Sequence, residues 1–201
     1  KSDGSTLSLQ AYESIGGVIG ALARRAEELH STMDEASQKI IRQLFLRLVT
    51  LGEGTEDTRR RVAWSELMSF TGKDDTTQMR ATMQKVLDNF GRYRLLTGDR
   101  DPVTREPTIE VAHEALIREW KRLRDWLDES RSDVRSQRIL ASAASEWVSA
   151  DREVSFLLSG AHLGQFEEWM NTADLALTEE ERAYLEISLE QRDIRLRAEA
   201  E

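Results

Sequence analysis

The sequence predicts a mainly α-helical chain in which a winged helix, made of three helices and a short β-hairpin wing, precedes a helical bundle domain. Only 2 of the 201 residues are Pro and 32% are charged, a composition that favours helices. Near residue 93 the spacing of apolar residues changes from three-and-four to alternation, which predicts a hairpin between helices. A chain of this length can form two compact units.

The first two helices are predicted from apolar residues at helical spacing. Residues 12–29 form the first helix, and residues 40–49 carry the apolar face of the second. Thr32 and Glu35 form a capping box, Thr-x-x-Glu, that we expect to start the second helix. Gly52 and Gly54 then end it, and residues 53–61 follow as a polar loop.

Two further helices complete the predicted three-helix core of the winged helix. Residues 65–70 form a short helix, and residues 76–90 form a longer one that repeats apolar side chains at three and four. Asp74 or Asp75 is the expected cap of the longer helix.

The wing is predicted from two short runs that read as strands. These are residues 93–97 and 108–111, and they flank a ten-residue polar tip over residues 98–107.

Helical spacing returns at His113 and continues to the end of the chain. The helix that begins there carries Leu116, Trp120, Leu123 and Leu127 on its apolar stripe. Three more helices are predicted over residues 134–149, over residues 155–170 and from Thr178 onward, where Thr178 and Glu181 form a second capping box.

Composition excludes several kinds of site. The chain has no Cys, which excludes disulfides, thiol nucleophiles and cysteine-bound zinc. Its three His residues are scattered, so no metal site is expected; His30 and His162 are expected to be packing or surface residues. No apolar run approaches the roughly 20 residues that span a bilayer, so we expect no membrane contact and a cytoplasmic location.

The charge distribution argues against nucleic acid as a partner. Residues 34–112 hold 13 basic and 13 acidic side chains, whereas residues 113–201 hold 12 basic and 20 acidic ones. Nucleic-acid binding depends on Lys and Arg that neutralise phosphates, and neither part has an excess of them. The five Trp residues recur on apolar helical faces, which is typical of core positions.

The most distinctive stretch is residues 111–127, VAHEALIREWKRLRDWL. Together with residues 44–49 and 58–62, it resembles the region that follows the nucleotide-binding domain in bacterial STAND-class NTPases. Residues 12–26 look like the end of that family's helical lid, and residues 157–163 resemble its trailing helical domain. The resemblance divides the chain into three parts: the end of the lid over 1–31, the winged-helix domain over 32–112 and the C-terminal helical domain over 113–201.

STAND proteins are signalling switches of the AAA+-related class. In them a sensor, often a WD-repeat propeller, controls an ATPase core that gates an effector such as a caspase-like protease. The resemblance therefore implies three partners for this segment: an upstream nucleotide-binding domain, a downstream sensor domain and an effector of unknown identity. It also implies that the full-length protein can oligomerise on activation.

The resemblance assigns the site residues. In the family the winged helix folds back over bound ADP, and a His at the start of the helix after the wing approaches the diphosphate; His113 and Glu114 occupy that place. Without the resemblance, His113 would read as a locally bonded His at a helix start and Glu114 as a first-turn acid. The nearby cations Arg118, Lys121 and Arg122 could face the nucleotide-binding domain, although a solvated face with partners such as Glu114 explains Arg118 equally well.

No Gly-x-x-x-x-Gly-Lys-Ser/Thr motif occurs, so phosphate cradling is expected upstream of Lys1. We therefore expect no catalytic residue and no cofactor bound by this segment alone, with ADP or ATP and Mg²⁺ held by the full-length protein. Two other functions stay open: a winged-helix transcription regulator that reads DNA with residues 76–90, and a purely structural interaction adaptor.

Overall fold

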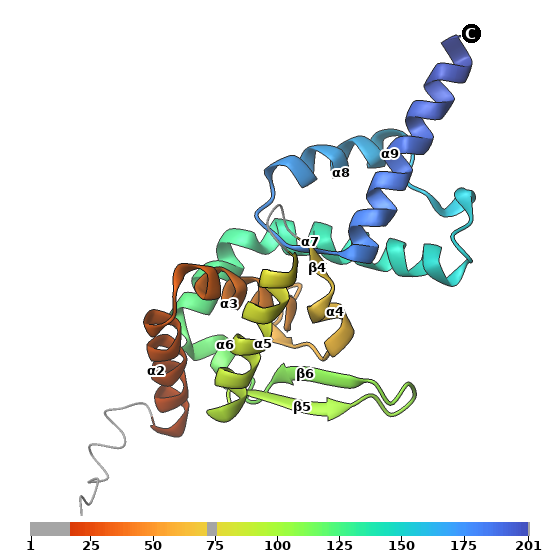
Figure 1. Cartoon of the computed structure of the whole chain (residues 1–201). Helices are drawn as coiled ribbons and strands as arrows, with labels where there is room; N and C mark the ends of the chain where they lie inside the picture. Colours follow the sequence, from red (N-terminus) through yellow and green to blue (C-terminus); the bar gives the residue numbers. More distant parts are fainter. Residues whose placement is uncertain (1–16, 72–75, 201) are drawn as a thin grey trace, which may run out of the picture. The chain divides into compact units, whose positions relative to one another are not determined.

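The computed structural model describes residues 17–71 and 76–200, and it confirms the mainly helical fold with small antiparallel sheets (Figure 1). The chain divides into two compact units. The first comprises the described part of residues 1–63 together with residues 82–129, and the second comprises the described part of residues 64–81 together with residues 130–201. The proposed division at 31/32 and 112/113 stays a prediction. No helix within the described ranges is long and apolar enough to cross a membrane.

The wing belongs to the first unit and is confirmed. It consists of β5 (Leu96–Arg100) and β6 (Pro107–Val111), which pair antiparallel, so the tip is shorter than predicted. A third strand, β3 (Val62–Ala63), is not predicted from the sequence; it pairs with β6 and makes the order β3-β6-β5. Thr108 and Val111 are buried in this sheet, whereas most of β5 is exposed.

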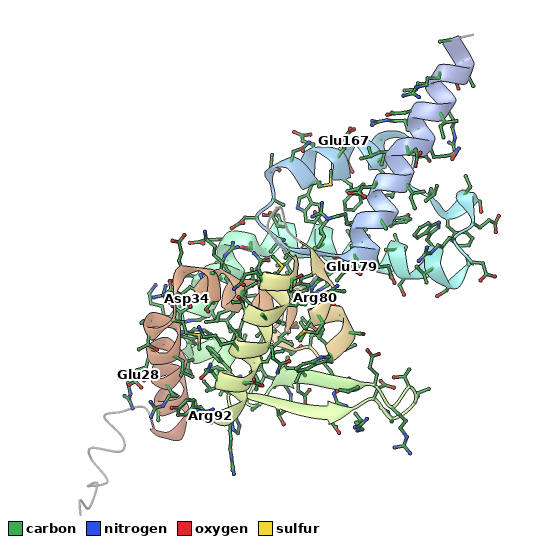
Figure 2. The ribbon with its side chains drawn as sticks, in the orientation of Figure 1. Glu28, Asp34, Arg80, Arg92, Glu167 and Glu179 are labelled. Carbon is green, nitrogen blue, oxygen red and sulfur yellow. The ribbon has the colours of Figure 1, made fainter. Side chains whose placement is uncertain are left out.

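The helices of the first unit begin with α2 (Gly17–Thr32) and α3 (Glu35–Arg47). The expected start of the first helix at residues 12–16 lies outside the described residues. The predicted capping box at Thr32 is wrong, because Thr32 still belongs to α2. Asp34 caps α3 instead: its carboxylate accepts the backbone N–H of Ser37 at 2.8 Å, and Figure 2 shows it at the start of that helix.

The end of α3 also differs from the prediction. The helix ends at Arg47, and Val49 lies in β1 (Val49–Thr50), which pairs with β2 (Thr58–Arg59) within the predicted loop. The strand pairing supplies backbone hydrogen bonds that a continued helix would otherwise have provided, so the helix stops before the glycines of the loop.

α5 (Thr76–Arg92) begins where the sequence predicts, but its expected cap at Asp74 or Asp75 lies outside the described residues. The predicted helix from His113 is broken in two. α6 (Ala115–Glu119) has five residues and is followed by Trp120, whose ψ of 98° is extended. α7 (Lys121–Ser149) then continues without a break through the expected gap at residues 128–133. No Gly or Pro marks the break in the sequence.

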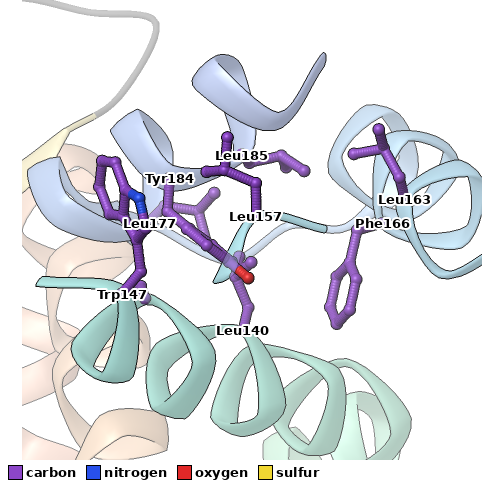
Figure 3. Packing of buried hydrophobic residues seen from close by; sticks show 9 residues of the cluster. Leu140, Trp147, Leu157, Leu163, Phe166, Leu177, Tyr184 and Leu185 are labelled. Atoms are coloured by element: carbon purple, nitrogen blue, oxygen red, sulfur yellow. The ribbon is translucent and has the colours of Figure 1, made fainter. Parts of the chain in front are cut away.

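The second unit contains the remaining part of α7 together with α4 (Trp64–Met68), α8 (Gly160–Thr172) and α9 (Glu179–Ala200). Its core is formed by side chains from α7, α8, α9 and the segments between them (Figure 3). These are Leu140, Ala144, Trp147, Leu157, Leu163, Phe166, Leu177, Tyr184 and Leu185. Burial of Trp147 confirms its expected core position, as does burial of Trp120 in the first unit.

Two helix predictions in the second unit need correction. The short helix stops at Met68, and Phe70 lies in β4 (Phe70–Thr71), which pairs with β7 (Leu177–Thr178). The helix expected over residues 155–170 is a 3₁₀ turn (Val154–Phe156) followed by α8, because the chain runs extended at Leu157 and turns with a positive φ of 56° at Gly160.

The second predicted capping box is confirmed. Thr178 Oγ1 accepts the backbone N–H of Glu181 at 3.1 Å, and a Glu181 carboxylate oxygen accepts the backbone N–H of Thr178 at 2.9 Å. Both residues are buried, and Gln137 donates to the other oxygen of Glu181 at 2.6 Å. The box therefore fixes the start of α9 and links it to α7.

We predict that Thr178→Ala lowers the free energy of unfolding by about 1 kcal/mol, because one buried backbone N–H at the start of α9 loses its acceptor. Thr178→Ser should retain most of that stability. Denaturant unfolding of both variants measures the difference, with Glu180→Gln, an exposed neighbour in the same helical turn, as the control. Equal stability of Thr178→Ala and the control would contradict the role given to this cap.

Candidate functional site

His113 lies at the base of the wing, in the turn between β6 and α6. Its side chain is exposed, and among the described residues its imidazole has no hydrogen-bond partner. Its backbone carbonyl accepts the N–H of Leu116 at 2.9 Å, which fixes the backbone and leaves the imidazole uncommitted. A helix of five residues develops only a small dipole, so any anion at this place would depend on side chains and not on the start of α6.

Glu114 does not act as a side-chain cap of α6. Its carboxylate accepts the backbone N–H of Arg59 at 3.4 Å, which ties the turn after the wing to β2. Nor does Glu114 pair with Arg118: the Arg118 guanidinium lies 2.6 Å from the Glu56 carboxylate. The local helical pairing considered for these two residues is therefore absent.

The three candidate interface cations each have an acidic partner. Besides Arg118, Lys121 lies 2.6 Å from Asp125 one turn along α7, and Arg122 lies 2.5 Å from Glu27 on α2. The pairs of Arg118 with Glu56 and of Lys121 with Asp125 are exposed and contribute little to stability. The pair of Arg122 and Glu27 joins residues 95 positions apart and fixes α2 against the start of α7.

The Glu27 carboxylate accepts several hydrogen bonds. The Nε of Arg122 donates to it at 2.9 and 3.1 Å, an Nη donates at 2.5 Å, and the indole Nε1 of Trp120 donates at 2.9 Å. The bonds from Arg122, with a smaller contribution from Trp120, lower the pKa of Glu27 to about 2, against the opposing effect of burial. The sequence shows no sign of this pair, because neither helical spacing nor a motif relates its two members.

His30 lies beside this pair and is buried, with 6% of its surface exposed. Its ring is 5.4 Å from Trp126 and 6.5 Å from Trp120, and its Nδ1 has no hydrogen-bond partner among the described residues. Burial, and then the charge of Arg122, lowers the pKa of His30, which favours the neutral imidazole. His30 is thus a packing residue, as the sequence predicts, and His162 is exposed.

A pocket of about 520 Å³ lies over this region of the first unit. Its lining mixes both charges with two indoles: Ala23, Arg24, Glu27, Glu119, Trp120, Lys121, Arg122, Asp125, Trp126 and Glu129. Several of these charges already neutralise one another, so the lining offers no evident nucleophile with an adjacent base. Across residues 17–71 and 76–200, no group of three or more His, Asp or Glu residues could hold a metal ion.

We predict that Glu27→Gln destabilises the protein by about 1 kcal/mol at neutral pH, since Arg122 loses its charged acceptor and solvent screens the half-exposed pair. The pKa of Glu27 is lower in the folded protein than its ordinary value of 4.5. Its stabilising effect is therefore complete above pH 4.5 and declines as the pH falls towards 2. The stability difference between the native protein and the variant should shrink over that interval. A difference that is independent of pH, or equal to that of the neighbouring control Glu28→Gln, would contradict this account.

Comparison with known proteins identifies the chain's family. A family model described as Novel STAND NTPase 1 matches residues 1–155, about three quarters of the chain. No curated protein and no solved structure matches the chain. The matched residues include the wing, the turn with His113 and the pair of Glu27 and Arg122. The chain therefore belongs to the Novel STAND NTPase 1 family.

Proposed function

We propose that this chain is the non-catalytic switch segment of a STAND signalling ATPase. In this proposal the winged helix closes over ADP held by a nucleotide-binding domain of the same polypeptide, and it relays the state of a sensor domain to an effector. The family match supports the class of protein. The observation that carries the proposal within the chain is His113, an exposed imidazole at the base of the wing whose backbone is fixed.

The chemistry of His113 suits a phosphate contact. A neutral imidazole can donate one hydrogen bond to a phosphate oxygen, and a protonated one adds a charge. β6 and α6 hold the turn from both sides, so the backbone of His113 is fixed before a ligand arrives and only its side-chain rotamer has to be ordered on binding. We assign Glu114 a positioning role through its bond to Arg59, because it would repel a phosphate at short range.

The cations Arg118, Lys121 and Arg122 enter the proposal in a reduced role. Each forms an ion pair with an acidic residue of the chain. A contact with the nucleotide-binding domain would therefore have to break that ion pair or add to it. Arg122 is the least available, because it also holds α2. Arg118 and Lys121 are the exposed candidates for such an interface.

The DNA-binding alternative is disfavoured by the acidic partners of two cations in the helix that would read DNA, Arg80 and Lys85. Lys85 lies 3.0 Å from Asp34, and Arg80 forms an ion pair with Glu179, a pair visible in Figure 2. A helix that reads DNA needs such cations for phosphates and base edges. The adaptor alternative has no observation in its favour beyond the mixed charge of the surface.

We predict that His113→Ala, in the full-length protein with its nucleotide-binding domain, speeds dissociation of ADP about tenfold to a hundredfold and raises basal signalling. The loss of a charge-assisted hydrogen bond costs the closed state about 1.5 to 3 kcal/mol, which accounts for a change of this size. Stopped-flow release of a fluorescent ADP measures the effect.

His162→Ala is the matched control, because His162 is also exposed and lies on α8. If His113 only packs locally, its substitution would lower the melting temperature and leave both the ADP off-rate and basal signalling unchanged. That pattern would refute the switch role.

A further inference from the structure

Arg94 adopts a backbone conformation that side chains seldom occupy. It lies two residues after the end of α5, and its φ is +56°, in the left-handed region. The N–H of Leu95 donates to the carbonyl of Phe90 at 3.0 Å, and the N–H of Arg94 donates to that of Gly91 at 2.9 Å. This is the helix ending in which Gly usually takes the left-handed position, because Gly has no Cβ to strain.

Among the described residues, Arg105, Asp151 and Arg152 also have a positive φ, but Arg94 is the one next to the base of the wing. Backbone strain at a non-glycine residue persists only where the surroundings enforce it, and it concentrates at functional sites. Arg94 is exposed, and within the described part of the chain its guanidinium has no ion pair or hydrogen bond. Packing therefore does not account for the residue.

The hairpin brings Arg94 to His113. Leu96 pairs with Val111, and beyond that pair the N–H of Ala112 donates to the carbonyl of Leu95 at 3.0 Å. Arg94 is the residue before Leu95, and His113 is the residue after Ala112. The two lie one residue beyond the last hydrogen bond of the hairpin, Arg94 in the segment that leads into β5 and His113 in the segment that follows β6.

The acidic side chains of this region are occupied elsewhere. Glu110 lies 3.5 Å from Arg61, Glu114 accepts from the backbone of Arg59, and Glu28 on α2 lies 2.9 Å from Arg25. Arg92 at the C-terminal end of α5 adds a further exposed cation near Arg94 in the sequence (Figure 2). Arg92 and Arg94 are thus two exposed cations at the end of α5, on a chain whose net charge is -9.

We propose that Arg94 and His113 together form a phosphate-binding site at the base of the wing, with Arg94 as the second contact to the diphosphate of the nucleotide. This inference rests on the proposed function, because the nucleotide reaches the wing from the nucleotide-binding domain. A guanidinium presents a planar fork of N–H donors that binds two phosphate oxygens at once, and it stays charged at every physiological pH. The hydrogen-bonded helix ending fixes the backbone of Arg94, and therefore the point from which its side chain extends.

The test is Arg94→Gly in the full-length protein. Glycine suits the left-handed backbone, so the melting temperature without nucleotide should stay the same or rise slightly. The fluorescent-ADP off-rate should increase at least tenfold, because one bidentate contact to phosphate is lost. If Arg94 had only a structural role, its replacement would not weaken ADP binding while leaving the melting temperature unchanged or higher.

Arg105→Gly is the matched control. Arg105 also has a left-handed backbone, with a φ of +63°, but it lies at the tip of the wing, so its replacement should leave the ADP off-rate unchanged. If His113→Ala speeds ADP release and Arg94→Gly does not, the assignment of Arg94 is wrong and the proposed function stands. If neither variant changes the off-rate, both are wrong. If Arg94→Gly lowers the melting temperature together with ADP binding, Arg94 is structural and this inference fails.

Discussion

The buried indole of Trp120 is the interaction on which the first unit depends. Trp120 is 2% exposed, and its ring lies 5.0 Å from Phe45, 6.3 Å from Phe90 and 5.5 Å from Trp126. Its Nε1 donates to Glu27, so the one polar atom of the ring is also satisfied. Aromatic pairs of this kind contribute about 0.5 to 1.5 kcal/mol each beyond the area they bury. Through these contacts one side chain joins α2, α3, α5 and α7.

The position of the candidate site follows from Trp120. The chain is extended at this residue, which ends α6 after five residues and lets the indole enter the core. α6 is thereby held at its C-terminal end by Trp120 and at its N-terminal end by the last strand of the wing. The turn with His113 lies between these two fixed points, and the segment with Arg94 adjoins it through the hydrogen bond from Ala112 to Leu95. Rigid placement of this kind is what a contact to a phosphate group requires.

Local patterns in the sequence predicted the elements that depend on local chemistry. The box of Thr178 and Glu181, the helix α3 and the hairpin all arise from neighbouring residues and were found. The break at Trp120 was missed, because the residues around it favour helix and only tertiary burial of the indole explains it. The pairing of Phe70 with Thr178 and the bonds of Glu27 to Arg122 were also missed, since they join distant parts of the sequence. The family resemblance identified His113 as a candidate site residue, whereas Arg94 was identified only from its positive φ in the structure.

Hydrogen–deuterium exchange on the full-length protein, with and without ADP, tests the central claim most directly: the base of the wing, and not its tip, contacts the nucleotide. We expect ADP to slow exchange in the segments around residues 93–96 and 112–116, which meet at the base. Residues 101–106 at the tip should exchange at the same rate in both states. Protection confined to the tip, or no change at the base when ADP binds, would contradict the account.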